Sequence, residues 1–166
     1  IPSDDPVLFV EYRAIYGIRG SVQEHPDVII PLDRVAVRKE GSDITVLAFG
    51  RMVHKAMEAL LSIEQERGLS IELIDLRTLC PLDMEAINNS VEKTGHMVIV
   101  EEGCMTGGVG GEIAAKVMES SFYSLDAPIV RVAARDIPIP FSPYMEDQVL
   151  PSTEKIKEGI LKCLSS

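Results

Sequence analysis

The first candidate for chemistry is the stretch from Glu101 to Val117, EEGCMTGGVGGEIAAKV, where an apolar run leads into glycines and then a helical pattern. A strand, a glycine loop and a helix form the outline of a phosphate-binding turn. The dinucleotide pattern GxGxxG does not fit, because Gly108 and Gly110 match its first two glycines but Ile113 stands at the third. The Lys-Ser or Lys-Thr pair of a Walker loop is also missing.

Three carboxylates surround this glycine loop. Glu101 and Glu102 close the predicted strand, and Glu112 opens the predicted helix. Negative charge around a helix amino terminus repels a pyrophosphate that would bind there. We therefore favour a structural role over a nucleotide site: the glycines permit unusual backbone angles and close packing of the helix on the sheet.

A second polar stretch, DLRTLCPLD, places Asp75 and Arg77 at the end of another predicted strand. Ligands bind at that edge of open α/β sheets. The alternative, which we favour, is an ion pair between these two residues and a helix cap at Asp83 that together hold the loop.

The remaining nucleophile and base candidates stand alone. His54 and His96 have no acid or nucleophile near them in sequence, and Cys104 has no cationic neighbour that would activate its thiol. The three histidines are too far apart for a local metal motif. The residues by themselves therefore predict no catalytic constellation.

These side chains must be positioned by alternating strands and helices. Strands are predicted at 6–12, 34–39, 44–50, 70–76, 96–102 and 127–134, and helices at 51–68, 83–95, 111–125 and 151–164. Gly68 and Gly95 supply helix stops, and Ser152 is a candidate N-cap. The strands read as continuous apolar runs, which favours a largely parallel sheet covered by helices on both faces.

Two local details complete this prediction. The strands at 34–39 and 44–50 would pair as a hairpin across the turn EGSD if only local signals counted. The helix at 111–125 is predicted to bury one apolar face, made of Ile113, Ala114, Val117, Met118 and Phe122.

The charge, the apolar runs and the cysteines of the chain argue against several classes of protein. The 166 residues carry a formal net charge of −10, which argues against a bare nucleic-acid-binding surface. No apolar run is long enough to cross a bilayer, which predicts no membrane partner. Three cysteines without a CxxC pattern favour a reducing compartment. The polar stretch 17–31 resembles a linker, and a start without Met inside a loop-like segment suggests a fragment.

Six motifs in order resemble the beta subunit of the thiamine-diphosphate-dependent 2-oxo acid dehydrogenases, and most closely the pyruvate dehydrogenase type. They are PVLFVEYRAIYG, EGSDITVLAFGRMVHKAMEAL, IELIDLRTLCPLD, SVEKTG, VIVEEGCMTGGVGGEIAAKV and LDAPIVRVAARDIPIPFSPYMED. The resemblance runs over essentially the whole chain, and six motifs in order are more specific than one glycine loop.

This resemblance implies a fold and a division of the chain. Residues 1–30 would be the carboxyl-terminal remnant of a pyrimidine-binding domain plus linker, and residues 31–166 a transketolase C-terminal-type domain. The implied fold is α/β: a three-layer α/β/α sandwich with a five-stranded, mostly parallel sheet that has one antiparallel strand. In the family the first strand is antiparallel and is separated from the second by another strand, in conflict with the local hairpin.

The resemblance also implies a function for the whole enzyme. A pyruvate dehydrogenase would decarboxylate pyruvate and pass the acetyl group to a lipoyl arm, with thiamine diphosphate and magnesium as cofactors. The alternatives are an acetoin or branched-chain 2-oxo acid dehydrogenase beta subunit and a non-catalytic module that binds a small ligand. The family's catalytic glutamate and histidine lie upstream, and the diphosphate and magnesium sit on the alpha subunit. We therefore expect no catalytic and no cofactor-binding residue in this chain, and an inactive fragment.

Two sites carry over by position. Ile1, Ser3 and Asp5 match a loop that helps to hold potassium, although Ser3 stands where some members have aspartate. Asp126 and Ser166 match an aspartate and a terminal carboxylate that face the subunit-binding domain of the dihydrolipoyl acyltransferase. The other implied partners are the alpha subunit and a second beta subunit. The implied location is the cytoplasm in a bacterium, and the mitochondrial matrix or plastid stroma in a eukaryote.

Overall fold

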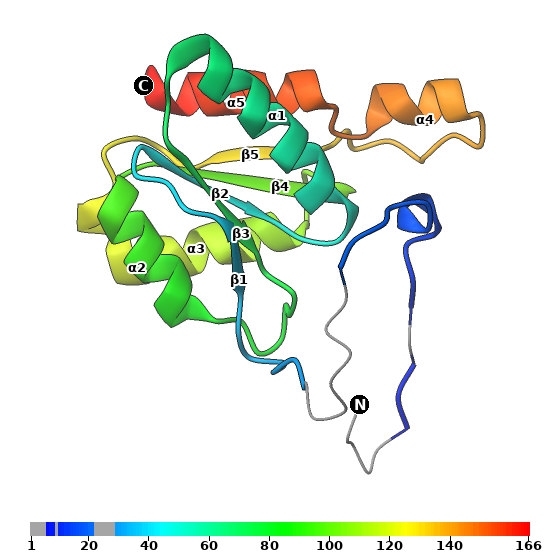
Figure 1. Ribbon diagram of the computed structural model, residues 1–166, viewed down its shortest axis with the longest axis horizontal. Coiled ribbons are helices and arrows are strands. Elements are labelled where there is room, and N and C mark those ends of the chain that lie inside the picture. Colours follow the sequence, from blue (N-terminus) through cyan, green and yellow to red (C-terminus); the bar gives the residue numbers. More distant parts are fainter. Residues whose placement is uncertain (1–5, 9, 22–28) are drawn as a thin grey trace.

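The protein is described by a computed structural model that covers residues 6–8, 10–21 and 29–166. Figure 1 shows a central sheet between two layers of helices, with α1 and α5 on one face and α2 and α3 on the other. The strands are β1 (Ala36–Lys39), β2 (Ile44–Ala48), β3 (Ile71–Asp75), β4 (Met97–Cys104) and β5 (Val130–Ala134). The helices are α1 (Arg51–Arg67), α2 (Met84–Thr94), α3 (Val109–Ser121), α4 (Pro143–Val149) and α5 (Thr153–Leu164), with short 3₁₀ turns η1 (Arg13–Ile15) and η2 (Phe122–Ser124).

The sheet has the order β1-β3-β2-β4-β5, with β1 antiparallel and the others parallel. This confirms the three-layer sandwich that the resemblance implied. The local hairpin prediction is wrong, because β3 lies between β1 and β2. Burial explains the order: Ile71, Leu73 and Ile74 of β3 need cover on both sides, whereas β1 has two exposed residues and suits an edge.

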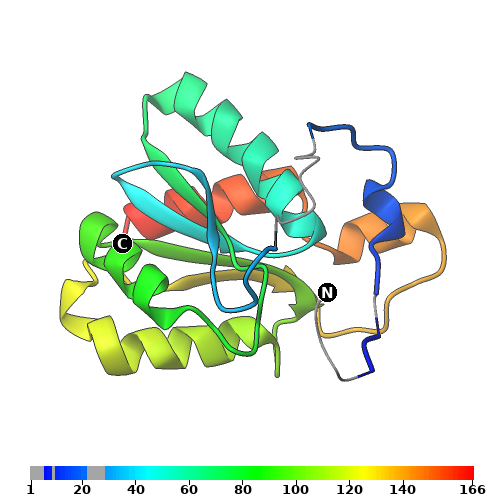
Figure 2. The ribbon, with the colours of Figure 1, turned by 60° about the horizontal axis from the view of Figure 1, so that its bottom comes forward.

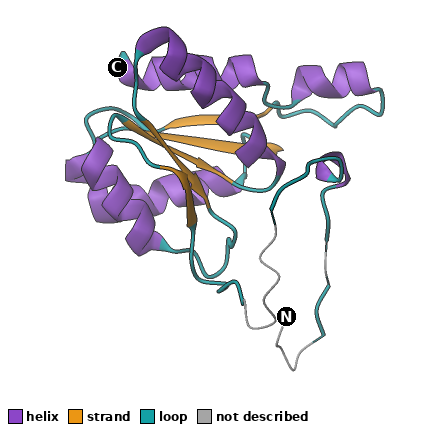
Figure 3. Ribbon diagram, in the orientation of Figure 1, coloured by secondary structure: helices purple, strands orange, loops and turns teal. Residues whose placement is uncertain are grey.

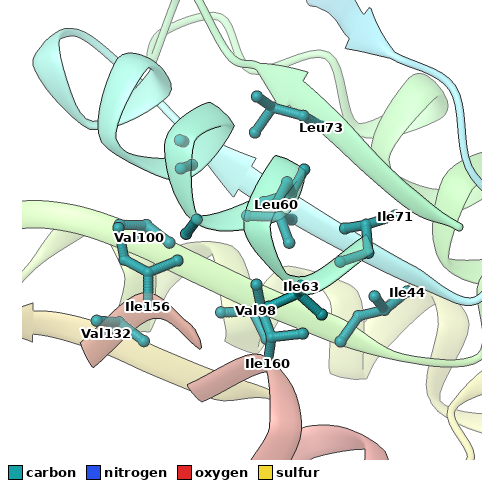
Figure 4. Packing of buried hydrophobic residues seen from close by; sticks show 14 of the residues in the cluster. Ile44, Leu60, Ile63, Ile71, Leu73, Val98, Val100, Val132, Ile156 and Ile160 are labelled. Carbon is teal, nitrogen blue, oxygen red and sulfur yellow. The ribbon is translucent and has the colours of Figure 1, made fainter. Parts of the chain in front are cut away.

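Two cores fill the spaces above and below the sheet. Figure 4 shows the cluster under α1 and α5, where Leu60 and Ile160 meet Val98. The cluster on the other face joins Leu47 and Ile99 to Ile87 of α2 and Ile113 of α3. All five residues of β2 are buried, as expected for a central strand with helices on both faces.

Polar hydrogen bonds fix α2 on the sheet. The Thr45 hydroxyl on β2 lies 2.6 Å from the Ser90 hydroxyl and 2.8 Å from the Thr94 hydroxyl on α2. Ser90 and Lys93 both donate to the buried carboxylate of Glu72 on β3. Because every buried polar group here has a partner, the network specifies the position of α2.

The predicted helix boundaries are mostly confirmed. Gly68 and Gly95 follow α1 and α2 in the left-handed conformation, each with φ of 68°. Asp83 accepts a hydrogen bond from the Ala86 amide, and Ser152 accepts one from the Lys155 amide. These are the expected cap geometries at helix ends.

Two further sequence predictions of structure are corrected, and one helix was missed. The segment at 6–12 is not a strand in its described residues, and Leu8 is 88% exposed, because no described strand pairs with it. The helix predicted to Leu125 ends at Ser121 and continues as η2. The seven-residue α4 was missed: it follows a proline-rich run and starts at Pro143, a residue suited to the first helical turn. Figure 3 shows the resulting helices, strands and loops.

Candidate functional site

The glycine loop after β4 is filled by the protein's own carboxylate. The Glu101 side chain is 1% exposed, and both of its oxygens accept from the Gly110 amide at 3.2 Å. A Cβ on Gly108 would lie 2.4 Å from the Cys104 carbonyl oxygen and 2.6 Å from Glu101 Oε2. The internal carboxylate thus occupies the place near the α3 amino terminus where a phosphate would bind.

Arg131 of β5 completes this arrangement. Its guanidinium donates to Glu101 Oε1 at 2.9 Å and to the Met105 carbonyl at 2.7 Å. The ion pair neutralises the buried carboxylate and ties β4, β5 and the loop together. Among the glycines of this loop only Gly107 has positive φ, so Gly108 and Gly110 are required for close packing and not for unusual backbone angles.

A second charged group stands at the carboxyl ends of β2 and β4. The guanidinium of Arg51 lies 3.4 Å from Glu102 Oε1. Burial raises the pKa of Glu102, Arg51 opposes this shift, and Glu146 adds to it. The Tyr12 ring lies against Gly50, and burial followed by the charge of Glu102 raises the pKa of the Tyr12 hydroxyl. These contacts make a charged, ordered edge without a nucleophile and base pair among the described residues.

The loop after β3 is held by local interactions. Asp75 Oδ1 accepts from the Arg77 amide at 3.2 Å, but its ion pair is with Arg38 at 3.7 Å. Asp75 therefore pairs with Arg38 of β1 and not, as was expected, with Arg77. Arg38 lies too far from Asp75 in sequence for local patterns to predict this pair. Asp83 caps α2 and also accepts from the Val35 amide at 3.2 Å. These contacts hold the loop, and of them only the Asp83 cap was expected from the sequence.

Within the described residues, no hydrogen bond or ion pair joins the histidine and cysteine candidates to an acid or to one another. His54 is half-buried on α1, and the Nδ1 of the half-buried His96 lies 3.1 Å from the Thr94 carbonyl oxygen. Cys104 is exposed at the end of β4. Burial raises the pKa of the Cys163 thiol, so this third cysteine is inert packing.

The two predicted partner-binding residues lie at the opposite, amino-terminal edge of the parallel strands. Asp126 is exposed just before β5, and its amide donates to the Gly95 carbonyl at 2.8 Å, directly after α2. Ser166 is exposed and its hydroxyl donates to Lys162 at the end of α5. The Cys163 thiol of α5 lies 3.8 Å from the Pro128 carbonyl, so both residues stand at the same end of the molecule.

The described residues do not fit the implied cofactors. The glycine loop at the start of α3 holds Glu101, and Glu102 and Glu112 add negative charge beside it. In the described part of the chain no three His, Cys, Asp or Glu residues are grouped so that they could hold a metal. The potassium candidates Ile1, Ser3 and Asp5 lie outside the described residues. None of the described helices is long and apolar enough to span a membrane.

Comparisons with known proteins agree with the fold and with the motifs. A family model described as "Transketolase, C-terminal domain" matches residues 33–156. A solved structure titled "Split gene transketolase, inactive beta4 tetramer" is 29% identical, with a TM-score of 0.74, over 85% of this chain and 45% of that one. Figure 2 shows the same sandwich from a second direction.

Three curated relatives are beta subunits. The acetoin:2,6-dichlorophenolindophenol oxidoreductase beta subunit of Bacillus subtilis is 41% identical over 99% of this chain and 47% of its own length. The mitochondrial pyruvate dehydrogenase E1 beta subunit of Rattus norvegicus is 39% identical over 99% and 47%. The 2-oxoisovalerate dehydrogenase beta subunit of Bacillus subtilis is 39% identical over 96% and 49%. The chain therefore spans about half the length of the relatives it matches.

Proposed function

The chain belongs to the transketolase C-terminal domain family, and from this we infer that it forms the carboxyl-terminal part of a 2-oxo acid dehydrogenase beta subunit. The observation that carries the inference is similarity to named beta subunits along nearly the whole chain, at 39–41% identity in the three relatives above. In this proposal residues 1–30 belong to a preceding pyrimidine-binding domain and its linker, and residues 31–166 form the assembly domain.

The substrate we propose is pyruvate, with acetyl transfer to lipoyl groups. The stretches VIVEE and TGGVG, which resemble pyruvate-type subunits, support this choice over acetoin or a branched-chain 2-oxo acid. In the whole enzyme thiamine diphosphate would supply the electron sink for decarboxylation. The described residues form no site that fits that cofactor or magnesium, and the part we propose for this domain is subunit assembly with an alpha subunit and a second beta subunit. Location would follow the source: cytoplasm, mitochondrial matrix or plastid stroma.

Activity of the complete subunit tests this proposal. The full-length beta subunit, assembled with its alpha subunit, should reduce 2,6-dichlorophenolindophenol when given thiamine diphosphate, magnesium and pyruvate. The ratio of kcat/KM values for pyruvate, acetoin and 3-methyl-2-oxobutanoate decides among the three substrates. Preference for acetoin or the branched-chain acid would replace pyruvate, and no turnover with any of them would favour a small-ligand-binding module.

We also propose that Asp126 and Ser166 face the subunit-binding domain of a dihydrolipoyl acyltransferase. Both are exposed at the same end of the sandwich, and Asp126 lies against Gly95 at the carboxyl end of α2. A negative charge is disfavoured at a helix carboxyl end, so a purely structural role would favour a neutral or basic residue at position 126. The alternative is a loop aspartate that caps its own turn.

Docking is tested by Asp126→Asn in the intact alpha–beta assembly. Binding to the subunit-binding domain should weaken by roughly 1–3 kcal/mol, the scale of a charge-assisted hydrogen bond, and should weaken further as salt rises. The matched control is Asp147→Asn, the same change on exposed Asp147 of α4, which Figure 1 places at the other end of the sheet. Equal affinity of the Asp126 variant and the unaltered assembly would leave Asp126 as a turn residue.

A further inference from the structure

The strand order of the sheet reverses between β2 and β4. In the order β1-β3-β2-β4-β5, the chain adds β3 on one side of β2 and then adds β4 on the other side. The helix that follows β2 is α1, which covers one face, and the helix that follows β4 is α3, which covers the other face (Figure 1). The loops after these two strands therefore diverge, and open α/β sheets bind their ligands at such a switch point.

In this protein an aromatic ring of its own chain lies at the switch point. Gly50, between β2 and α1, has a positive φ of 56°, and a Cβ at this position would lie 2.5 Å from the Tyr12 ring. Burial raises the pKa of the Tyr12 hydroxyl, and the charge of Glu102 on β4 raises it further. The ring therefore lies against the loop after β2 and close to the end of β4, where a ligand of an open sheet would bind.

The ring belongs to residues 10–18, which lie outside the sheet. In the part of the chain that the structure describes, the hydrogen bonds of these residues stay within the segment: the Ile15 amide donates to the Tyr12 carbonyl, and the Ile18 amide donates to the Ile15 carbonyl. Tyr12 is 40% exposed, whereas Tyr16 of the same turn is 66% exposed. A segment with local hydrogen bonds and few buried contacts opens without unfolding of the domain.

We propose that residues 10–18 form a strap across the carboxyl edge of the sheet, and that the Tyr12 ring is the plug that holds the strap closed at the switch point. Glycine at position 50 leaves the space that the ring fills, since a Cβ there would come closer to the ring than van der Waals contact permits. The switch point thus holds the protein's own chain in a fixed place. A small ligand would reach it only after the strap opens.

Amide hydrogen exchange in the full-length protein tests the strap. Tyr12→Ala should lower the protection factors of the Ile15 and Ile18 amides roughly 5- to 30-fold, because the packing of the ring is lost. Tyr12→Phe keeps the ring and should leave these protection factors unchanged. Tyr16→Ala is the matched control, the same change on a more exposed ring whose hydroxyl donates to Glu11 of the same segment, and it should also leave them unchanged.

The other side of the contact is tested at Gly50. Gly50→Ala should displace the ring and lower the same protection factors, whereas Gly68→Ala should not, because Gly68 also has positive φ but faces open space. In a Tyr12→Ala background, Gly50→Ala should add no further loss. If Gly50→Ala unfolds the sheet, which the exchange of β3 amides would report, the tyrosine variants decide alone. Unchanged protection in Tyr12→Ala, or an equal loss in Tyr12→Ala and Tyr16→Ala, would overturn the plug.

Discussion

The buried pair Glu101–Arg131 provides the sharpest test of how the glycine loop is held. Glu101→Gln keeps the shape of the side chain but removes the charge that faces Arg131 at 2.9 Å. Two unit charges about 4 Å apart interact by about 4 kcal/mol at an effective dielectric constant of about 20. Because the Arg131 side chain is 22% exposed, water compensates part of the loss. We therefore expect the free energy of unfolding to fall by about 2–4 kcal/mol.

Urea denaturation of the variants measures this loss in the free energy of unfolding. The comparison requires that this free energy falls with urea concentration at the same slope in each variant. The matched control is Glu102→Gln at the next position. Burial raises the pKa of Glu102, so folding makes its ionised form less favourable than in the unfolded chain, and any stability that its protonated form contributes is lost as pH rises through the folded pKa. Replacing it with a neutral amide should change stability by no more than about 1 kcal/mol at neutral pH.

A double-mutant cycle tests whether the ion pair between Glu101 and Arg131 causes the loss of stability. Arg131→Met keeps the apolar stem and leaves Glu101 buried without its cation, so it should also destabilise strongly. The double variant should lose less than the sum of the two single losses, with a coupling of about 1–3 kcal/mol. Losses that simply add, within about 0.5 kcal/mol, would contradict the view that Glu101 is stabilised in the loop by Arg131.

Three further predictions follow from the packing and the charges. Gly110→Ala should destabilise the protein by about 1–3 kcal/mol, because its Cβ would lie 2.5 Å from Glu101 Oε1. In Gly111→Ala the nearest contact of the new Cβ is 3.5 Å away, so this change should be tolerated or should stabilise α3. Equal melting temperatures of the two variants would contradict this difference. Gly95→Ala should destabilise the protein more than Gly68→Ala. Both glycines have φ of +68°, but only a Cβ on Gly95 would meet the Asp126 side chain, at 2.2 Å. In an Asp126→Ala background, the two variants should therefore show equal losses in thermal unfolding. Burial by itself raises the pKa of Glu72, but hydrogen bonds from Lys93 and Ser90 outweigh burial and lower the pKa. The stability that Glu72 contributes is therefore present above its ordinary pKa of about 4.3 and is lost as pH falls through the folded pKa. Glu72→Gln should reduce the fall of the urea midpoint at acid pH, whereas the exposed control Glu92→Gln should leave it unchanged.

The sequence by itself determined the elements and the class of the fold. Continuous apolar runs such as Ile44–Ala48 predicted buried parallel strands, because a strand with helices on both faces has no polar side. Gly68, Gly95 and Ser152 predicted helix ends because cap geometry depends on only a few neighbouring residues. The carboxylates around the glycine loop argue against a phosphate from the sequence alone, since charge is visible without coordinates, but the contact of Glu101 with the Gly110 amide was not predicted.

Only the tertiary structure decided which distant residues meet. Pairing of β1 with β3 depends on burying β3 from both sides, and local turn signals at EGSD carry no information about a strand thirty residues away. The partner of Asp75 proved to be Arg38 on β1, and the partner of Glu101 proved to be Arg131 on β5. Helical periodicity assigned Met118 and Phe122 to one buried face of a single helix, but α3 ends at Ser121 and the edge of the sheet leaves both side chains about half exposed.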